Sequence, residues 1–530
     1  MNSKKGLTVL LTTLLSSAIV FSGCSSNTTK SGSSSSESPK NTASSTAAAV
    51  KSDLKPYEVV MVYPDSTQRD LEKVQNAMNE YLKSTYPEMN MTVKLNPVDW
   101  GAWGDKTNLM FASGEKFDTI FTANWLGFES QVNKGALLPL DDLLKQYGPD
   151  IEKVEKDYHS GATRGGKIYG IHTHQELGGS QGIVVRKDLA EKYHFDLAAL
   201  AKSRKMEDLE PMLKTIKENE PGITPMVGLP LPLEAYFKSG KMEMILDPVG
   251  LVRSNKDFKA VSYYDTDEYM NLARLTHSWF KQGYINKDAS TSVQSNNDGW
   301  SKMKTGNAFA IAGADMEIVS DNSVPAPMPI RSKQVGMDLI QIPFNIDSLR
   351  TRKLADTTQA ISKNSEDPAR AMMLLNLFFK DAKLLSLFNY GIEGTHYVLK
   401  NGQVDLPEGK TTDNVGFYHD NQWQIGNQML NYTRVGEDPK KYENYEKFNK
   451  DVAADPSIIF GFIFDSEPVK NELIAIENVR KTYDAGLNSG TLDPDVEVPK
   501  LTSKLKAAGI DKVVAEVQKQ LDEWRKANGK

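Results

Sequence analysis

Residues 57–64, YEVVMVYP, decide the fold, because this short β-branched run ended by a proline predicts a buried strand. Residues 70–86 come next with apolar side chains at helical spacing, and residues 91–95 alternate as a second strand. A helix around residues 106–112 precedes a third strand at residues 117–121. This β-α-β-α-β order predicts an α/β fold with a mostly parallel, twisted sheet covered by helices on both faces.

A second alternation of elements follows further along the chain. Short apolar runs predict four more strands, at residues 170–173, 182–186, 307–312 and 356–361. Asp367 as N-cap, Pro368 at the first position and Gly391 beyond the end predict one long helix over residues 368–388. The last helix is expected over residues 502–527, with Trp524 on its apolar face.

The first 23 residues have the pattern of a secretory signal. Lys4 and Lys5 precede an apolar run at residues 7–21, which is shorter than the roughly 20 residues of a membrane-spanning helix. The following residues, Ser22-Gly23-Cys24, complete a stretch that resembles the lipobox of bacterial lipoproteins. The resemblance implies cleavage before Cys24 and lipid attachment there, which would anchor the chain to the outer face of the bilayer. An ordinary secreted protein with a leftover cysteine is the alternative.

Composition narrows the classes of function. The 530-residue chain is 39% hydrophobic, carries a formal net charge of −6 and has a single cysteine, Cys24. A net acidic chain without long basic runs is a poor candidate for nucleic-acid binding. One cysteine excludes intramolecular disulfides, cysteine-based zinc sites and iron–sulfur clusters, and no cofactor is expected. Residues 25–55 are mainly small and polar, so we expect them to stay flexible as a tether.

Five sequence motifs resemble elements of the extracellular solute-binding proteins of bacterial ABC importers, and they occur in the same order as in that family. They are GALLPLDDLL (135–144), GKIYGI (166–171), VRKDL (185–189), GNAFA (306–310) and AISKNS (360–365). Two further stretches, YGIEGTHY (390–397) and GFIFDSEPVK (461–470), resemble a lipoprotein subgroup with a C-terminal DUF3502 domain that is linked to oligosaccharide import. His172 departs from the pattern, because the family usually has proline there.

This resemblance implies a two-lobed, periplasmic-binding-protein-like (type II) α/β fold with several hinge crossovers and a mainly helical C-terminal extension. The lobes would close on an oligosaccharide without altering it chemically, and an ABC transporter permease in the membrane would recognise the closed conformation. The chain is expected to be a monomer. Its expected division is a signal peptide at 1–23, a lipidated tether at 24–55, lobe 1 at 56–170 and about 300–355, lobe 2 at about 171–299 and 356–455, and a DUF3502-like region at 456–530.

Candidate ligand-binding side chains come from strand ends and turns. A sugar presents apolar C–H faces and a rim of hydroxyl groups, so its site needs flat aromatic rings beside fixed donors and acceptors. In open α/β sheets, ligands bind outside the carboxyl ends of the strands. The candidate set is Asp99, Trp100, Asn124, Trp125, His174, Gln175, Trp300, Glu393 and Trp423. Structural alternatives stay open, namely packing for the tryptophans and helix capping for Glu393.

Other functions remain as alternatives to sugar binding. On a strand, His172, His174 and Glu176 would share one face and form a plausible zinc set, although a polar wall of the cleft is the simpler interpretation. A secreted glycoside hydrolase would need two carboxylates about 5–10 Å apart, for which Asp99 and Glu393 are the conceivable pair. A peptide-binding or sensory lipoprotein on the same fold is a third possibility, since a fold does not fix its ligand.

Overall fold

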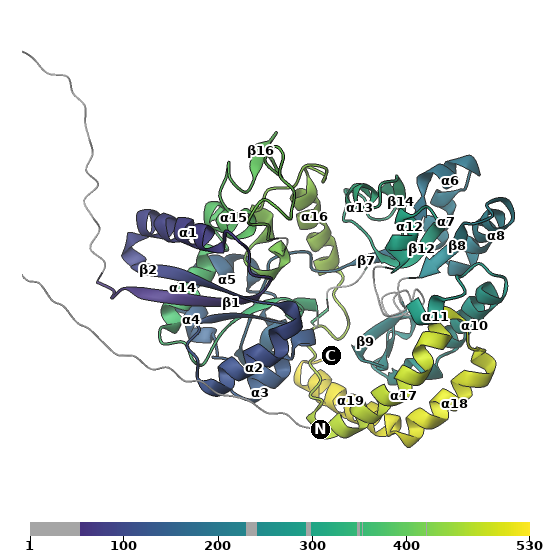
Figure 1. Ribbon diagram of the computed structural model, residues 1–530. Helices are drawn as coiled ribbons and strands as arrows, with labels where there is room; N and C mark the ends of the chain where they lie inside the picture. Colours follow the sequence, from purple (N-terminus) through teal and green to yellow (C-terminus); the bar gives the residue numbers. More distant parts are fainter. Residues whose placement is uncertain (1–52, 229–240, 293–297, 347–349, 352, 420) are drawn as a thin grey trace, which may run out of the picture. The chain divides into compact units, whose positions relative to one another are not determined.

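The computed structural model describes residues 53–228, 241–292, 298–346, 350–351, 353–419 and 421–530 (Figure 1). The signal segment, Cys24 and nearly all of the tether lie outside the described residues, so the expectations of cleavage, lipidation and tethering stay predictions. Within the described ranges, no helix is both long enough and apolar enough to cross a bilayer. The described residues form two lobes, each built on its own five-stranded sheet with its own apolar core.

The first lobe is built on a sheet with the strand order β2-β1-β3-β15-β6. Its strands are β1 (Tyr57–Pro64), β2 (Met91–Val98), β3 (Thr119–Thr122), β15 (Thr358–Ile361) and β6 (Ile171–His172). Strand β1 pairs in parallel with β2 and β3, whereas β15 runs antiparallel to both of its neighbours. Every residue of β1 from Val59 onward is buried, which requires cover on both faces of the sheet. The predicted parallel arrangement is confirmed for β1, β2 and β3, whereas β15 makes the other two pairings of the sheet antiparallel.

Helices pack on this sheet and carry its connections. Helix α1 packs on β2, and α14 packs on β1 and β15. The helices and 3-10 turns of this lobe are α1 (Leu71–Thr85), η1 (Pro87–Met89), η2 (Trp100–Ala102), α2 (Trp103–Ser113), η3 (Asn124–Leu126), α3 (Phe128–Asn133), α4 (Asp141–Tyr147), α5 (Pro149–Glu155), η4 (His159–Ala162), α14 (Pro368–Leu377), α15 (Ala382–Tyr390), η9 (Gln422–Gln424), η10 (Gln428–Leu430) and α16 (Lys441–Ala454). Two small hairpins join them, β4 (Thr163–Arg164) with β5 (Lys167–Ile168) and β16 (Val398–Lys400) with β17 (Gln403–Asp405).

The prediction of one helix over residues 368–388 is wrong. Helix α14 ends at Leu377, and α15 begins at Ala382 after an N-cap at Asp381. The Asp381 carboxylate accepts hydrogen bonds from the backbone N–H groups of Lys383 and Leu384, which starts a new helix where the apolar spacing alone suggests continuity. The predicted cap at Asp367 is confirmed, since its side chain accepts from the backbone N–H of Arg370 at 3.1 Å.

The second lobe is built on a sheet with the strand order β13-β14-β7-β12-β8. Its strands are β13 (Ala326–Pro327), β14 (Leu339–Ile346), β7 (Ser180–Arg186), β12 (Ala308–Asp315) and β8 (Thr224–Gly228). A smaller sheet consists of β9 (Met242–Leu246), β10 (Val249–Val252) and β11 (Ala260–Ser262). The other elements of residues 187–355 are α6 (Lys187–Lys192), α7 (Leu197–Ser203), η5 (Met206–Leu209), α8 (Glu210–Asn219), η6 (Arg253–Asn255), η7 (Tyr263–Asp265), α10 (Asp267–Lys281), α11 (Ala289–Ser292), α12 (Asp298–Lys304), α13 (Pro329–Val335) and η8 (Lys353–Ala355).

Strand pairing corrects the expected division of the chain. We expected residues 300–355 in lobe 1 and residues 356–455 in lobe 2, but β12 hydrogen-bonds to β7 and β8 of the second sheet. Strand β15 instead pairs with β3 and β6 of the first sheet. The sequences of β12 and β15 are both typical of buried strands. The lobe to which each strand belongs depends on its hydrogen-bonding partners, and no local sequence pattern specifies those partners.

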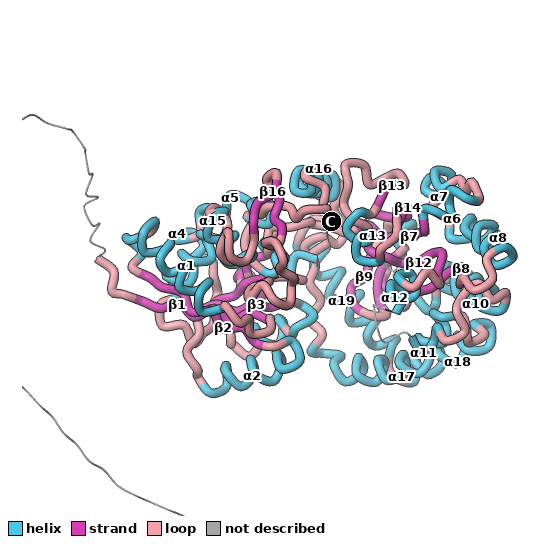
Figure 2. The backbone as a smooth tube through the Cα atoms, turned by 45° about the horizontal axis from the view of Figure 1, so that its top comes forward, coloured by secondary structure: helices cyan, strands magenta, loops and turns pink. Residues whose placement is uncertain are grey.

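The C-terminal region completes the second lobe. Its elements are η11 (Glu467–Val469), α17 (Lys470–Ser489), α18 (Pro494–Ala507) and α19 (Ile510–Ala527). Helices α17 and α18 pack against α10, and α19 packs on β11. Figure 2 draws these four helices in cyan. Leu501 and Leu521 belong to the same apolar cluster as Phe309 of β12. The predicted final helix over 502–527 is interrupted, because Gly509 adopts a φ of 97° between α18 and α19.

Candidate functional site

Three tryptophans from separate segments form one aromatic surface, which we call the tryptophan platform. Trp100 lies in η2 after β2, Trp125 lies in η3 after β3, and Trp423 lies in η9. The Trp100 ring stacks on Trp125 at a centroid distance of 5.9 Å and on Trp423 at 6.1 Å, with interplanar angles of 22° and 20°. Trp125 is 52% exposed and Trp100 is 39% exposed, so the platform presents flat apolar area to solvent.

Hydrogen bonds and packing below the platform fix its rings in place. The indole N–H of Trp125 donates to the backbone carbonyl of Asp356 at 2.8 Å. The buried ring of Phe121 meets Trp423 edge-on at 5.4 Å. The η9 turn is tied to the sheet because Gln359 Nε2 donates to the Gln424 carbonyl and Gln424 Nε2 donates to the Pro64 carbonyl. The platform is therefore rigid before any ligand arrives, which lowers the entropy cost of binding.

Polar groups at the carboxyl ends of β1 and β2 border the platform. The exposed Asp99 caps η2 by accepting from the Gly101 backbone N–H at 2.9 Å, and its other carboxylate oxygen lies 3.5 Å from Ser66 Oγ. Asp65 accepts from the buried His419 Nδ1 at 2.7 Å. The exposed Asp99 supplies an acceptor for sugar hydroxyl groups beside the aromatic faces, whereas Asp65 is buried and its other oxygen accepts from the Ser66 backbone N–H.

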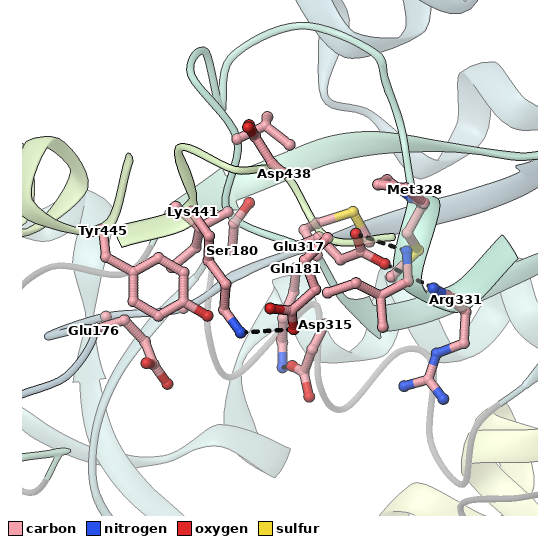
Figure 3. A pocket seen from close by; sticks show the side chains of 18 of the residues that line it. Glu176, Ser180, Gln181, Asp315, Glu317, Met328, Arg331, Asp438, Lys441 and Tyr445 are labelled. Atoms are coloured by element: carbon pink, nitrogen blue, oxygen red, sulfur yellow. Dashed lines mark hydrogen bonds and ion pairs between the residues drawn. The ribbon is translucent and has the colours of Figure 1, made fainter. Parts of the chain in front are cut away.

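A cavity of about 550 Å³ lies in the same region of the fold, and Figure 3 shows the side chains that line it. Its lining includes Asp356, whose carbonyl accepts from Trp125, so the cavity and the platform meet at this residue. The segment connecting the lobes contributes Glu176, while β7 and β12 of the second lobe contribute Ser180 and Asp315. Residues from both lobes and from the connection thus line the same space.

The opposite sides of this cavity differ in origin. Lys441 and Tyr445 project from α16 of the first lobe, whereas Glu317, Met328 and Arg331 come from the second lobe (Figure 3). Burial raises the pKa of Glu317, although the backbone N–H groups of Arg331 and Ile330 donate to its carboxylate and partly offset that effect. Burial also lowers the pKa of Arg331 and raises that of Tyr445.

Asn124, another candidate, borders a second cavity of about 400 Å³. Glu129 and Arg164 of the first lobe line this cavity together with β9 of the second lobe. The guanidinium of Arg164 already pairs with Glu129. Asn124 and Trp125 are adjacent in η3, so this turn lines the second cavity through Asn124 and hydrogen-bonds through Trp125 to Asp356, which lines the first.

His174 and Gln175 are held in the connecting segment by contacts within the protein. Gln175 is 2% exposed, and its Nε2 donates to Thr357 while its Oε1 accepts from Gln428. The Nδ1 groups of His172 and His174 donate to the fully buried carboxylate of Glu155 at 3.0 and 2.6 Å. Burial opposes ionisation of Glu155, but both imidazoles favour it, and its pKa is lowered overall.

The zinc set considered from the sequence is replaced by these contacts. His172 and His174 share Glu155, whereas Glu176 lies 3.9 Å from Lys353 Nζ. In the part of the chain that the structure describes, no three histidine, cysteine, aspartate or glutamate side chains are arranged to hold a metal ion.

Two candidates lie away from the platform. Trp300 belongs to α12 of the second lobe, where the guanidinium of Arg331 sits 4.4 Å above its ring. Trp300 therefore contacts Arg331, which lines the cavity of about 550 Å³, but does not line that cavity itself. Glu393 is exposed in the turn after α15, where its backbone forms an isolated β-bridge with Tyr397. It lines neither of the two cavities described above. The structure thus brings together Asp99, Trp100, Asn124, Trp125 and Trp423 from the predicted set.

Sequence reasoning missed several residues of this region. Asp65 and His419 are paired across 354 positions of the chain, a relation that no local pattern reveals. The α16 residues Lys441 and Tyr445 had a usable signal, because Tyr442, Phe448 and their neighbours recur at helical spacing. Glu155 closes a helix and has no sequence feature that predicts its two histidine partners.

Comparison with known protein families accounts for most of the chain. Residues 64–383 match the family model described as bacterial extracellular solute-binding protein. Residues 458–526 match the domain of unknown function DUF3502, which covers α17 to α19. The first model spans more than half of the chain.

Individual relatives agree with this assignment. A carbohydrate ABC transporter substrate-binding protein of Streptococcus pneumoniae is 29% identical over 442 residues, covering 81% of this chain and 84% of the relative. The polygalacturonan/rhamnogalacturonan-binding protein YtcQ of Bacillus subtilis is 25% identical over 338 residues, covering 61% of this chain and 63% of YtcQ.

A solved structure extends the likeness to the fold. The N-glycan transport solute-binding protein NgtS of S. pneumoniae superposes with a TM-score of 0.74 at 25% identity, covering 89% of this chain and 99% of NgtS. The complex of NgtS with Man5GlcNAc superposes with a TM-score of 0.64 at 26% identity. The two-lobed architecture, the matched family model and these relatives together place the chain in one family: it is a bacterial extracellular solute-binding protein.

Proposed function

We propose that this protein captures an oligosaccharide on the tryptophan platform and in the adjoining cavity, and delivers it unchanged to an ABC transporter permease. The observation that carries the proposal is the prearranged ring surface of the exposed Trp100 and Trp125 and the half-buried Trp423 beside a cavity of about 550 Å³. Aromatic faces cover the apolar C–H faces of sugars, and the exposed carboxylate of Asp99 accepts from hydroxyl groups.

The relatives support the class of ligand. NgtS is named for N-glycan transport and has been solved with Man5GlcNAc, and the matched S. pneumoniae relative is named as a carbohydrate-binding component of an ABC transporter. Two lobes joined by crossing segments are suited to hinge closure around a ligand. A permease that binds only the closed form would then distinguish the loaded from the empty protein.

We also propose that the protein acts at the outer face of the membrane, anchored by lipid on Cys24 after removal of residues 1–23.

The experiment is incubation of the purified protein with a panel of oligosaccharides that includes Man5GlcNAc. Thermal unfolding measures binding, and chromatography of the incubated sugars measures chemical change. We expect a rise in Tm with at least one oligosaccharide and recovery of that sugar intact. Accumulation of shorter products would indicate a hydrolase instead, and the absence of any Tm shift across the panel would contradict oligosaccharide binding.

A further inference from the structure

Carboxylates dominate the cavity that adjoins the tryptophan platform. Three cations line it, namely Arg331, Lys353 and Lys441. Six carboxylates line the same space: Glu176, Asp315, Glu317, Asp356, Glu437 and Asp438. Even if Glu317 is set aside because burial favours its neutral form, the acids outnumber the cations.

Each of these cations already has a partner in the protein. Lys441 Nζ donates to Glu437 at 2.9 Å, and Lys353 Nζ lies 3.9 Å from Glu176. Arg331 donates through Nη1 to Gln334 Oε1 at 2.7 Å and spreads its guanidinium over Trp300. Two of the three cations are therefore already paired with carboxylates of the same lining, which still holds more acids than cations.

The border of the platform has the same sign of charge. Asp65 and Asp99 follow the ends of β1 and β2, and the Asp99 carboxylate accepts from the Gly101 backbone N–H and from Ser66, neither of which is charged. Asp65 is buried, and its carboxylate already accepts from the Ser66 backbone N–H and from His419, so the exposed Asp99 is the acceptor that favours ligands presenting hydroxyl or amide donors. An anionic sugar would meet like charge at the platform as well as in the cavity.

We infer that the ligand is an uncharged oligosaccharide and that the acidic lining of the cavity and platform excludes polyuronate and other carboxylated glycans. The inference rests on the proposed function and specifies the charge of its ligand. Like charges within a partly desolvated site repel each other more strongly than in water, and an unpaired ligand carboxylate would also lose hydration. Family membership alone does not predict this choice, because YtcQ is named for binding polygalacturonan, a polyanion.

The test compares three forms of one sugar by calorimetry. Man5GlcNAc is measured as such, after oxidation of its primary hydroxyl groups to carboxylates, and after methyl esterification of those carboxylates. We expect the carboxylated form to bind at least about tenfold more weakly than Man5GlcNAc, and the methyl ester to recover to within about threefold. Binding of the neutral form should change little between about 0.05 and about 0.5 M salt.

A charge-neutralised variant checks that the lining is responsible. Asp315→Asn/Asp438→Asn keeps an acceptor for Gln181 and one of the two contacts of Asp438, which accepts from Asn444 and from the Lys440 backbone N–H, so we expect it to fold and to regain several-fold affinity for the carboxylated sugar. Asp142→Asn/Glu523→Gln removes two exposed charges elsewhere and should regain none.

The outcomes separate the inference from the function on which it rests. Equal affinity for the neutral and carboxylated forms would overturn the inference and leave oligosaccharide capture intact. Equal weakening of the carboxylated form and its methyl ester would assign the loss to shape, and would likewise overturn it. If none of the three forms binds, and no neutral sugar of the panel does, oligosaccharide capture itself is contradicted.

Discussion

Replacing Trp125 by alanine removes the most exposed ring of the platform. Its side chain is 52% exposed, and a tryptophan offers roughly 200 Å² of side-chain surface, so about 100 Å² is available to a ligand. At about 25 cal/mol per Å², complete coverage of that area contributes about 2.5 kcal/mol to binding, and half coverage about 1.3 kcal/mol. We therefore expect the Kd for the bound oligosaccharide to rise by about 10- to 70-fold.

Isothermal titration calorimetry of Trp125→Ala against the unmodified protein measures this change. Folding should be nearly unaffected, because an exposed ring contributes little to the core. Leu109→Ala is the matched control, since Leu109 is a 68% exposed apolar side chain of α2 that lines neither of the two cavities described above. Its Kd should equal that of the unmodified protein. A Kd for Trp125→Ala within about threefold of the unmodified value would refute the assignment of this ring to ligand contact.

Three further changes test the anchor, the C-terminal helices and the buried acid. Cys24→Ser should release the protein from membranes, and sedimentation with the membrane fraction after a salt wash would argue against lipidation. Leu521→Ala, at a side chain with no exposed area, should lower the free energy of unfolding by about 2–5 kcal/mol in denaturant titration; a loss below about 1 kcal/mol would show that α19 is not integral to the second lobe. Glu155→Gln should cost roughly 3 kcal/mol at neutral pH, because it removes the acid that His172 and His174 share. Because the pKa of Glu155 is lowered in the folded state, its carboxylate stabilises the fold at pH values above its ordinary pKa of about 4.5, and this stabilisation is lost as the pH falls further. The unmodified protein should therefore lose more stability than the variant on acidification. Parallel pH profiles of the two proteins would contradict the role given to Glu155.

The strands of the first lobe were predictable because each carries a local pattern. The YEVVMVYP run and the alternating β2 segment specify strand and burial directly, and the carboxyl ends of β2 and β3 then locate Asp99, Trp100 and Trp125. The structure adds that Trp423, about 300 residues later, joins the same surface.

What the sequence could not supply is long-range pairing. The lobe to which β12 and β15 belong depends on which strand each one meets, and the apolar runs of both are compatible with either sheet. His174 and Gln175 looked like cleft residues because they follow a crossing strand, but buried partners at Glu155 and Thr357 engage them. The acidic character of the cavity is also hidden in the sequence, since its carboxylates are spread from residue 176 to residue 438.

Hydrogen–deuterium exchange with and without Man5GlcNAc tests the central claim most directly, because it locates the ligand on the folded protein. Binding on the platform and in the cavity predicts slower exchange at residues 99–103, 122–126, 421–425 and 436–446, with little change in α6 to α8 of the second lobe. Slower exchange that is confined to α6 to α8, or that leaves the three platform segments unchanged while the sugar is bound, would show that the oligosaccharide lies elsewhere.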